Sequence, residues 1–282
     1  MGAAATTDDS NRSPVTARGG AGRQVAATLV MVSAIALFVV QEPWSGYGLI
    51  VAGLVLAAVV DRALLKHLAL IAASLVIIST MSLEADLSDA GMARFTVVLS
   101  AAVLLPFAIS RLWWREDIIR FPMLTGKRWS GFEYGYLALV VVAGYLLLPW
   151  YFIGTGAYQN WPEISGTNEI IRLFVGVNAV GLWDELFFIC TVFALLRRHF
   201  PFWQANVLQT IVFVSFLWEL GYRGIGPLLT IPFALLQGYI FQRTRSFTYV
   251  LVVHLTFDLI IFGILVHAYN PHLADVFLTS PR

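Results

Sequence analysis

The sequence is dominated by long apolar runs that short polar loops separate. They lie at residues 26–41, 46–60, 67–83, 95–112, 134–154, 168–197, 204–221, 225–242 and 246–268. A helix of about 20 apolar residues crosses the hydrocarbon core of a bilayer. We therefore predict an all-α fold, a polytopic transmembrane helical bundle of about eight or nine spans.

Composition supports a membrane protein and excludes several other classes. Hydrophobic residues make up 59% of the 282 residues and charged residues 12%, whereas soluble domains carry about 25% charged residues. The mean hydropathy is +0.77. The net charge is only +1 and no basic block occurs, so we expect a lipid bilayer and no nucleic acid as partner. The single cysteine, Cys190, can form neither an internal disulfide nor a cysteine metal cluster.

Lysine and arginine gather in alternate loops, which predicts the orientation. They precede the first run and follow the second, fourth, sixth and eighth, and the other loops are nearly free of them. We predict an integral protein of a bacterial inner or cell membrane, with the N-terminus cytoplasmic and the C-terminus outside. Residues 1–24 read as a disordered cytoplasmic tail, and residues 25–165 as N-terminal transmembrane helices.

A few ionisable residues lie within the apolar runs, where a charge costs about 2.5–3.5 kcal/mol on insertion scales. They are Asp184, Glu185, Glu219, His254 and Asp258. Because they come from three runs and from similar expected depth, we interpret them as one functional cluster. The alternative is that such residues only hydrogen-bond helices together.

The spacing of these residues makes further predictions. His254 and Asp258 are four apart and share one helix face, where they can orient a water or hold a metal ion. Asp184 and Glu185 are about 100° apart around a helix, so one should face a cavity and the other a neighbouring helix. We expect Gly176 and Gly181 to break or bend the sixth run, which would place the cluster in the outer half of the membrane.

Three segments of the C-terminal third carry a family resemblance. DELFFI at 184–189 is similar to a Glu-Glu-x-x-x-Arg motif, and HLTFD at 254–258 to a His-x-x-x-Asn/Asp motif. GYIFQRTRSFTYVLVVH at 238–254 resembles the usual approach to the last histidine. Together they resemble the CAAX-prenyl-protease and bacteriocin-processing (CPBP or Abi) family of intramembrane proteases. Ile189 stands in place of the motif arginine, and Glu219 in place of a second-motif histidine.

The resemblance implies an intramembrane endopeptidase with a catalytic helical core at residues 166–270. Its substrate would be a membrane-associated or C-terminally sorted protein or peptide, cut by water that carboxylates and histidine activate. Carried to this chain, Glu185 or Asp184 would be the base, and Glu219 a second carboxylate. His254 and Asp258 would stabilise charge or bind a ligand. The family leaves metal dependence open, so a divalent ion such as Zn²⁺ held by His254, Asp258 and Glu185 is one expectation.

Two alternatives remain open at this stage. The replaced arginine and histidine fit a non-catalytic relative that serves as an immunity or scaffold protein. The buried acids also fit a proton- or ion-coupled transporter, although no inverted repeat is evident in the sequence.

Overall fold

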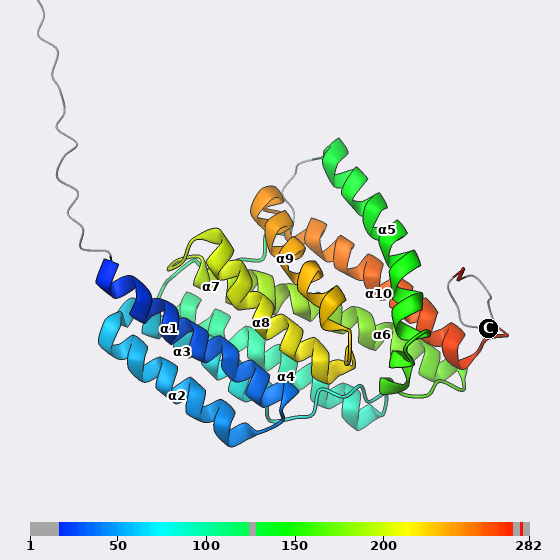
Figure 1. The fold of residues 1–282 in the computed structure, drawn as a ribbon, viewed down its shortest axis with the longest axis horizontal. Coiled ribbons are helices and arrows are strands. Elements are labelled where there is room, and N and C mark those ends of the chain that lie inside the picture. Colours follow the sequence, from blue (N-terminus) through cyan, green and yellow to red (C-terminus); the bar gives the residue numbers. More distant parts are fainter. Residues whose placement is uncertain (1–16, 124–127, 273–276, 279–282) are drawn as a thin grey trace, which may run out of the picture.

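The computed structural model describes residues 17–123, 128–272 and 277–278, and every regular element within these ranges is a helix (Figure 1). The N-terminal half contains α1 (Ala17–Ala34) with a π-helical continuation η1 (Ile35–Val39), α2 (Pro43–Val60), α3 (Arg62–Ile78), and α4 (Asp89–Ala108) with a π-helical continuation η2 (Ile109–Trp113). The C-terminal half contains α5 (Gly131–Phe152), the short 3-10 turn η3 (Ala157–Asn160), α6 (Thr167–Asp184), the π-helix η4 (Glu185–Phe193), α7 (Ala194–Leu196), α8 (Phe202–Leu220), α9 (Pro227–Thr244) and α10 (Phe247–Tyr269).

Each predicted apolar run corresponds to one long helix, so the predicted polytopic helical bundle is confirmed. In the described part of the chain, six helices are long and apolar enough to cross a membrane. They are Gly20–Val39, Pro43–Val60, Asp89–Trp113, Gly131–Phe152, Thr167–Leu196 and Phe247–Tyr269. For α3, α8 and α9 a membrane crossing stays a prediction.

Polar residues fix where several helices begin. Asp61 caps α3 by accepting hydrogen bonds from the backbone amides of Ala63 and Leu64 at 2.9 and 3.1 Å. Ser130 and Glu133 form a capping box at the start of α5. Ser246 caps α10 through the backbone amide of Tyr249 at 3.2 Å. Because these caps satisfy amides that the helix leaves unpaired, the loops between the apolar runs end where the caps stand.

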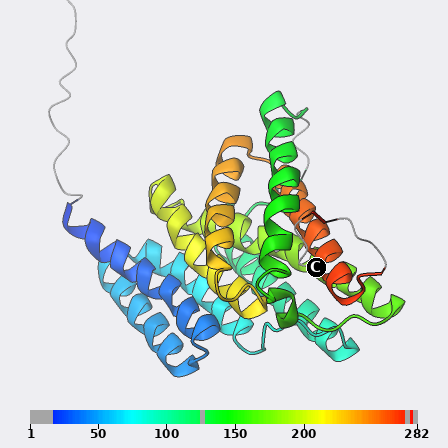
Figure 2. The ribbon, with the colours of Figure 1, turned by 45° about the vertical axis from the view of Figure 1, so that its right-hand side comes forward.

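Two views show how the helices are arranged. Helices α1 to α3 lie together at one end of the molecule, and α5 and α10 lie at the other (Figures 1 and 2). The packing partner of α5 is chiefly α10, which also packs on α6. Gly144 on α5 and Gly181 on α6 both face α10, and a methyl group at either position would collide with its side chains. Small residues thus let both neighbours approach α10 closely.

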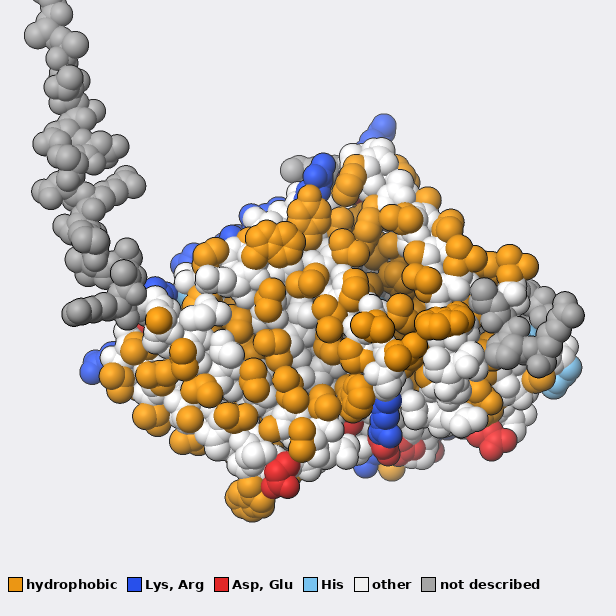
Figure 3. Space-filling model, in the orientation of Figure 1, with side chains coloured by type: hydrophobic (Ala, Val, Ile, Leu, Met, Phe, Trp, Pro, Cys, Tyr) orange, Lys and Arg blue, Asp and Glu red, His pale blue; other side chains and the backbone are white. Residues whose placement is uncertain are grey.

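The surface has the layering of a membrane protein. In Figure 3 a broad belt of hydrophobic side chains covers the visible face, most of the lysine and arginine lies along the upper edge, and most of the acidic residues lie along the lower edge. Such a belt between charged rims fits the thickness of a bilayer. The chain is an integral membrane protein.

Two sequence predictions about local structure are wrong. The predicted disordered tail, 1–24, is helical from Ala17 onward, and residues 1–16 lie outside the described residues. The sixth run is not broken at Gly176 or Gly181, because α6 continues through both as a regular α-helix. Glycine weakens a helix by about 1 kcal/mol per residue, and the packing of α6 against α10 offsets that cost.

The unbroken helix also changes the depth of the cluster. Asp184 lies 17 residues after Thr167 and 12 before Leu196, while His254 lies 7 residues after Phe247. Both are therefore nearer the arginine-rich ends of their helices. The prediction that the cluster lies in the outer half of the membrane depended on a break near Leu182, and the helix has no such break.

Candidate active site

The site begins where one helix changes its winding. Asp184 is the last residue of α6, and Glu185 is the first residue of the π-helix η4. The wider turn is visible in Thr191, whose hydroxyl donates to the carbonyl of Leu186, five residues earlier, at 2.9 Å. Short π-helical segments within α-helices are frequent at functional sites. The two adjacent acids face different sides of the helix, as predicted from their separation of about 100°, with Asp184 on a cavity and Glu185 on neighbouring helices.

Glu185 faces the neighbouring helices α9 and α10. Its Oε1 accepts a hydrogen bond from the Nε2 of Gln237 at 2.6 Å, and the Nδ1 of His254 lies 2.7 Å from the same oxygen. Gln237 Nε2 also donates to the carbonyl of Val250 at 3.1 Å. The Glu185 side chain is 1% exposed. Glu185 therefore orients the imidazole of His254 through its Nδ1 atom.

The other ring nitrogen of His254 faces two more carboxylates. His254 Nε2 lies 3.6 Å from Asp184 Oδ2 and 3.9 Å from Asp258 Oδ1. These distances exceed a direct hydrogen bond, but a water or a substrate atom between the groups would bond to more than one of them. When the neutral imidazole of His254 donates Nδ1–H to Glu185, its Nε2 carries a lone pair on this side. His254 and Asp258, which are four residues apart, share a helix face, as predicted.

A cavity of about 670 Å³ opens in front of these groups. Asp184, His254 and Asp258 line it, whereas Glu185 does not. The remaining wall is almost entirely apolar and comes from α4, α5, α6, α9 and α10, with Leu217 and Leu220 from α8. Figure 3 shows an apolar hollow in the region between α9 and α5 of Figure 1. The cavity thus joins a polar cluster to a surface that suits an apolar chain.

The polar cluster is incompletely satisfied within the protein. Asp184 Oδ1, Glu185 Oε2 and Asp258 Oδ2 are buried and have no hydrogen-bond partner among the described residues. No lysine or arginine in the described ranges pairs with these carboxylates. Leaving a buried polar group unsatisfied costs about 1–3 kcal/mol. Such an arrangement is expected where a substrate or water completes the bonding.

Glu219 does not join the cluster. Its Oε1 accepts a hydrogen bond from the backbone amide of Leu83 at 3.0 Å, and it does not line the cavity. The carboxylate instead ties the end of α8 to the loop after α3. The sequence analysis placed Glu219 in the cluster because the sequence gives the position of Glu219 along its helix but not the direction in which its side chain points.

The predicted metal ligands do not converge on one point. Glu185 lies at Nδ1 of His254 and Asp258 lies on the side of Nε2, so the imidazole separates the two carboxylates. In the described part of the chain, no group of three histidine, cysteine or acidic side chains is arranged to hold a metal ion. The set Glu185, His254 and Asp258 therefore does not fit a single metal ion as a chelate.

Sequence analysis missed Gln237, which holds Glu185 through a hydrogen bond. It is a buried amide within a predicted span, and polar side chains at such positions usually bond across helices. That signal was present in the sequence. What the sequence did not reveal was the partner, because α9 and η4 meet only through tertiary packing.

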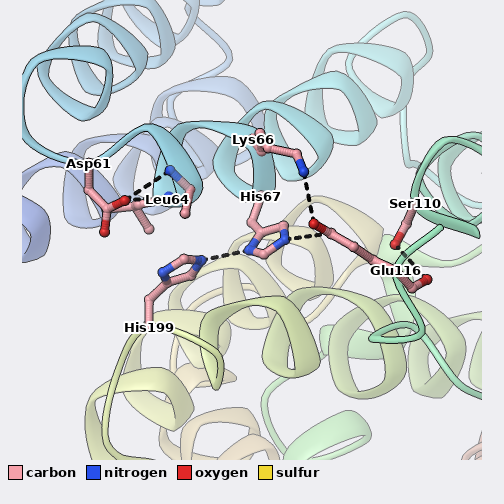
Figure 4. Close-up of polar contacts among 8 residues, drawn as sticks. Asp61, Leu64, Lys66, His67, Ser110, Glu116 and His199 are labelled. Atoms are coloured by element: carbon pink, nitrogen blue, oxygen red, sulfur yellow. Dashed lines mark hydrogen bonds and ion pairs between the residues drawn. The ribbon is translucent and has the colours of Figure 1, made fainter. Parts of the chain in front are cut away.

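A second polar cluster, which we call the paired network, lies at the ends of α1 and α3 (Figure 4). The Nε2 of His67 lies 2.9 Å from Glu116 Oε2, and the Nδ1 of His67 lies 2.6 Å from the Nε2 of His199. Arg23 Nη2 lies 3.3 Å from His199 Nδ1, and Lys66 Nζ donates to Glu116 Oε1 at 2.8 Å.

The direction of hydrogen bonding along this line follows from its ends. Arginine only donates, so His199 Nδ1 accepts, His199 Nε2–H donates to His67 Nδ1, and His67 Nε2–H donates to Glu116. Burial of His199, aided by the charge of His67, lowers the pKa of His199 to about 4. Burial of Glu116 opposes ionisation, but hydrogen bonds from Lys66 and His67 outweigh it and lower the pKa of Glu116. His199 is thus neutral near pH 7, and both of its ring nitrogens have a hydrogen-bond partner.

Comparison with protein families matches one segment of the chain. Residues 166–260 match the family described as type II CAAX prenyl endopeptidase Rce1-like. No curated protein and no solved structure matches the chain significantly. The matched segment contains α6, η4, α7, α8 and α9 and the part of α10 that carries His254 and Asp258. The resemblance to the CPBP proteases is confirmed for this segment.

Proposed function

On the premise that residues 166–260 form an Rce1-like segment of a CAAX-protease type, we propose that this protein is an intramembrane endopeptidase. Its substrate is a membrane-associated protein or peptide, which presents an apolar or lipid-modified stretch to the cavity. The observation that carries the proposal is the position of Asp184 Oδ2 and Asp258 Oδ1, 3.6 and 3.9 Å from the Nε2 of His254 at the wall of an apolar cavity. The second oxygen of each carboxylate has no partner among the described residues.

The geometry supports a division of roles between the acids. Water bound between His254 Nε2, Asp184 and Asp258 gives a proton to this group of acceptors as its oxygen attacks the peptide carbonyl carbon. Glu185 is a positioning residue that fixes the ring from Nδ1, and Gln237 fixes Glu185. The sequence left Asp184 and Glu185 as equal candidates for the base, and the cavity lining favours Asp184.

We further propose that the arginine-rich ends of the helices face the cytoplasm in a bacterial cell membrane. The site then lies closer to the cytoplasmic face, and substrates reach it from that side or from the bilayer. A reporter that works only outside the cytoplasm should therefore be active when it is fused to the C-terminus. If instead a reporter that works only in the cytoplasm were active at the C-terminus, the proposed orientation would be wrong.

The test compares protein termini in membranes from cells that express wild type, Asp184→Asn, His254→Ala and Asp89→Asn. Asp89 is an exposed carboxylate at the start of α4, so its variant repeats the chemical change away from the cavity. We expect new termini with wild type and Asp89→Asn and none with the other two, at equal expression. Identical termini in all four would exclude the protease, and acid-dependent ion flux would then indicate a transporter.

A further inference from the structure

Tyr222, in the turn that follows α8, reaches the cavity beside the carboxylates. It lines the same cavity as Asp184, His254 and Asp258 and is 9% exposed. Tyr222 and the carboxylates of Asp184 and Asp258 thus line one cavity. Since α8 itself contributes Leu217 and Leu220 to the wall, Tyr222 supplies the polar group on this side.

The backbone of the turn is fixed on both sides of Tyr222. Asn160 Nδ2 donates to the carbonyl of Gly221 at 3.0 Å, and the Tyr151 hydroxyl donates to the carbonyl of Arg223 at 2.8 Å. Gly221 has φ +139°, which a side chain rarely tolerates. A methyl group there would also lie 2.7 Å from Nε1 of Trp161. These contacts leave the turn little freedom.

The aromatic ring of Tyr222 is held equally firmly. It stacks with Tyr151 at a centroid distance of 6.4 Å and meets Phe152 and Trp161 edge-on at 5.5 and 6.1 Å. Yet its hydroxyl makes no hydrogen bond to the described residues, and it is not among their fully enclosed polar atoms. Buried tyrosine hydroxyls usually find a partner. A rigid phenol with its hydroxyl open to the cavity is a preorganised donor.

We propose that the Tyr222 hydroxyl donates a hydrogen bond to the carbonyl oxygen of the peptide bond that is cut. The water oxygen bonds to the carbonyl carbon, the water proton passes to the acceptors around His254, and the carbonyl π electrons move onto the oxygen that Tyr222 holds. The electron pair on that oxygen then re-forms the C=O bond and the C–N bond breaks as the proton passes to the departing nitrogen, which leaves a carboxylic acid and an amine. This inference rests on the proposed function.

Tyr222→Phe removes the donor and keeps the ring packing. We expect kcat to fall roughly 10²- to 10³-fold, as for loss of an oxyanion donor elsewhere, with KM changed by less than about twofold because the charge develops only in the transition state. The thermal unfolding temperature should stay at the wild-type value. Tyr47→Phe on α2 makes the same change at a hydroxyl that contacts Ser79 at 3.0 Å, and it should leave kcat unchanged.

A second measurement does not require cleavage. Purified protein binds 2-tridecanone labelled with ¹³C at its carbonyl, and NMR follows the carbonyl resonance. We expect a downfield shift with wild type and Tyr47→Phe that is lost with Tyr222→Phe. If the shift is lost only with Tyr222→Phe but wild type cleaves no protein, the Tyr222 hydroxyl is a carbonyl hydrogen-bond donor and the proposed protease function is excluded. Cleavage by Tyr222→Phe at the wild-type rate, or an unchanged ketone shift in that variant, would overturn the inference.

Discussion

The molecule contains two histidine–carboxylate clusters that differ in how completely they are paired. In the paired network, Glu116, His67 and His199 form a continuous hydrogen-bonded line that Lys66 and Arg23 close at its ends. Around His254, three carboxylates lie together without a basic partner other than the imidazole, and three of their oxygens have no partner among the described residues. Histidine and carboxylate side chains are thus paired with basic groups in one cluster and lack such pairing in the other.

The difference lies in what each cluster faces. The paired network joins α1, α3, the segment after η2 and the turn after α7, and every ring nitrogen of its two histidines has a partner. The cluster around His254 faces a cavity of about 670 Å³. Polar groups that are buried and fully bonded stabilise a fold, whereas buried groups that lack partners persist where a ligand completes them. Unpartnered carboxylate oxygens together with an adjoining cavity therefore distinguish the cluster around His254 from the paired network.

The largest expected effect comes from exchanging a histidine in each cluster for glutamine. His254→Gln should lower the rate of cleavage about 10²- to 10⁴-fold, because it removes the ring nitrogen that faces the cavity. His67→Gln should keep the activity per folded molecule but lower the unfolding free energy by about 1–3 kcal/mol, because it disrupts a buried hydrogen-bonded line. Kinetics and thermal unfolding in detergent measure both. Equal activity losses in the two variants would break the distinction.

An intermediate effect is expected from Gly181→Ala. The added methyl group would meet the carboxylate of Asp258, and displacing that group by about 1 Å should cost roughly 10- to 100-fold in rate. Gly48→Ala on α2 is the control, because its methyl group meets open space and Gly48 does not line the cavity. Kinetics of the two alanine variants measure the effect. If both variants retained wild-type rates, the position of Asp258 would not matter for cleavage.

The smallest effect concerns the pH dependence of stability. His199 has a pKa of about 4 in the folded protein, against an ordinary value of 6.5. The unfolded chain therefore takes up a proton first as the pH falls, and the folded state loses stability from about pH 7 towards pH 4. The unfolding temperature of His199→Gln should depend less on pH over this range than that of wild type. A pH dependence as steep as in wild type would show that His199 is not the group responsible.

The sequence by itself determined the helices and singled out four residues that meet at the candidate site. Apolar runs long enough to span a bilayer leave the backbone no alternative to a helix, so every predicted run has its helix. Because a buried charge in such a run is costly, Asp184, Glu185, His254 and Asp258 could be singled out, and they do converge.

Only the tertiary structure decided how these groups face one another. The sequence predicted that Asp184 and Glu185 face different sides, and helix packing decides that Glu185 faces Gln237 and His254 while Asp184 lines the cavity. The packing of α8 directs Glu219 to Leu83 and away from the cluster. Directions around a helix axis depend on its winding and its neighbours, which contacts between distant segments fix. Spacing along the sequence does not contain that information.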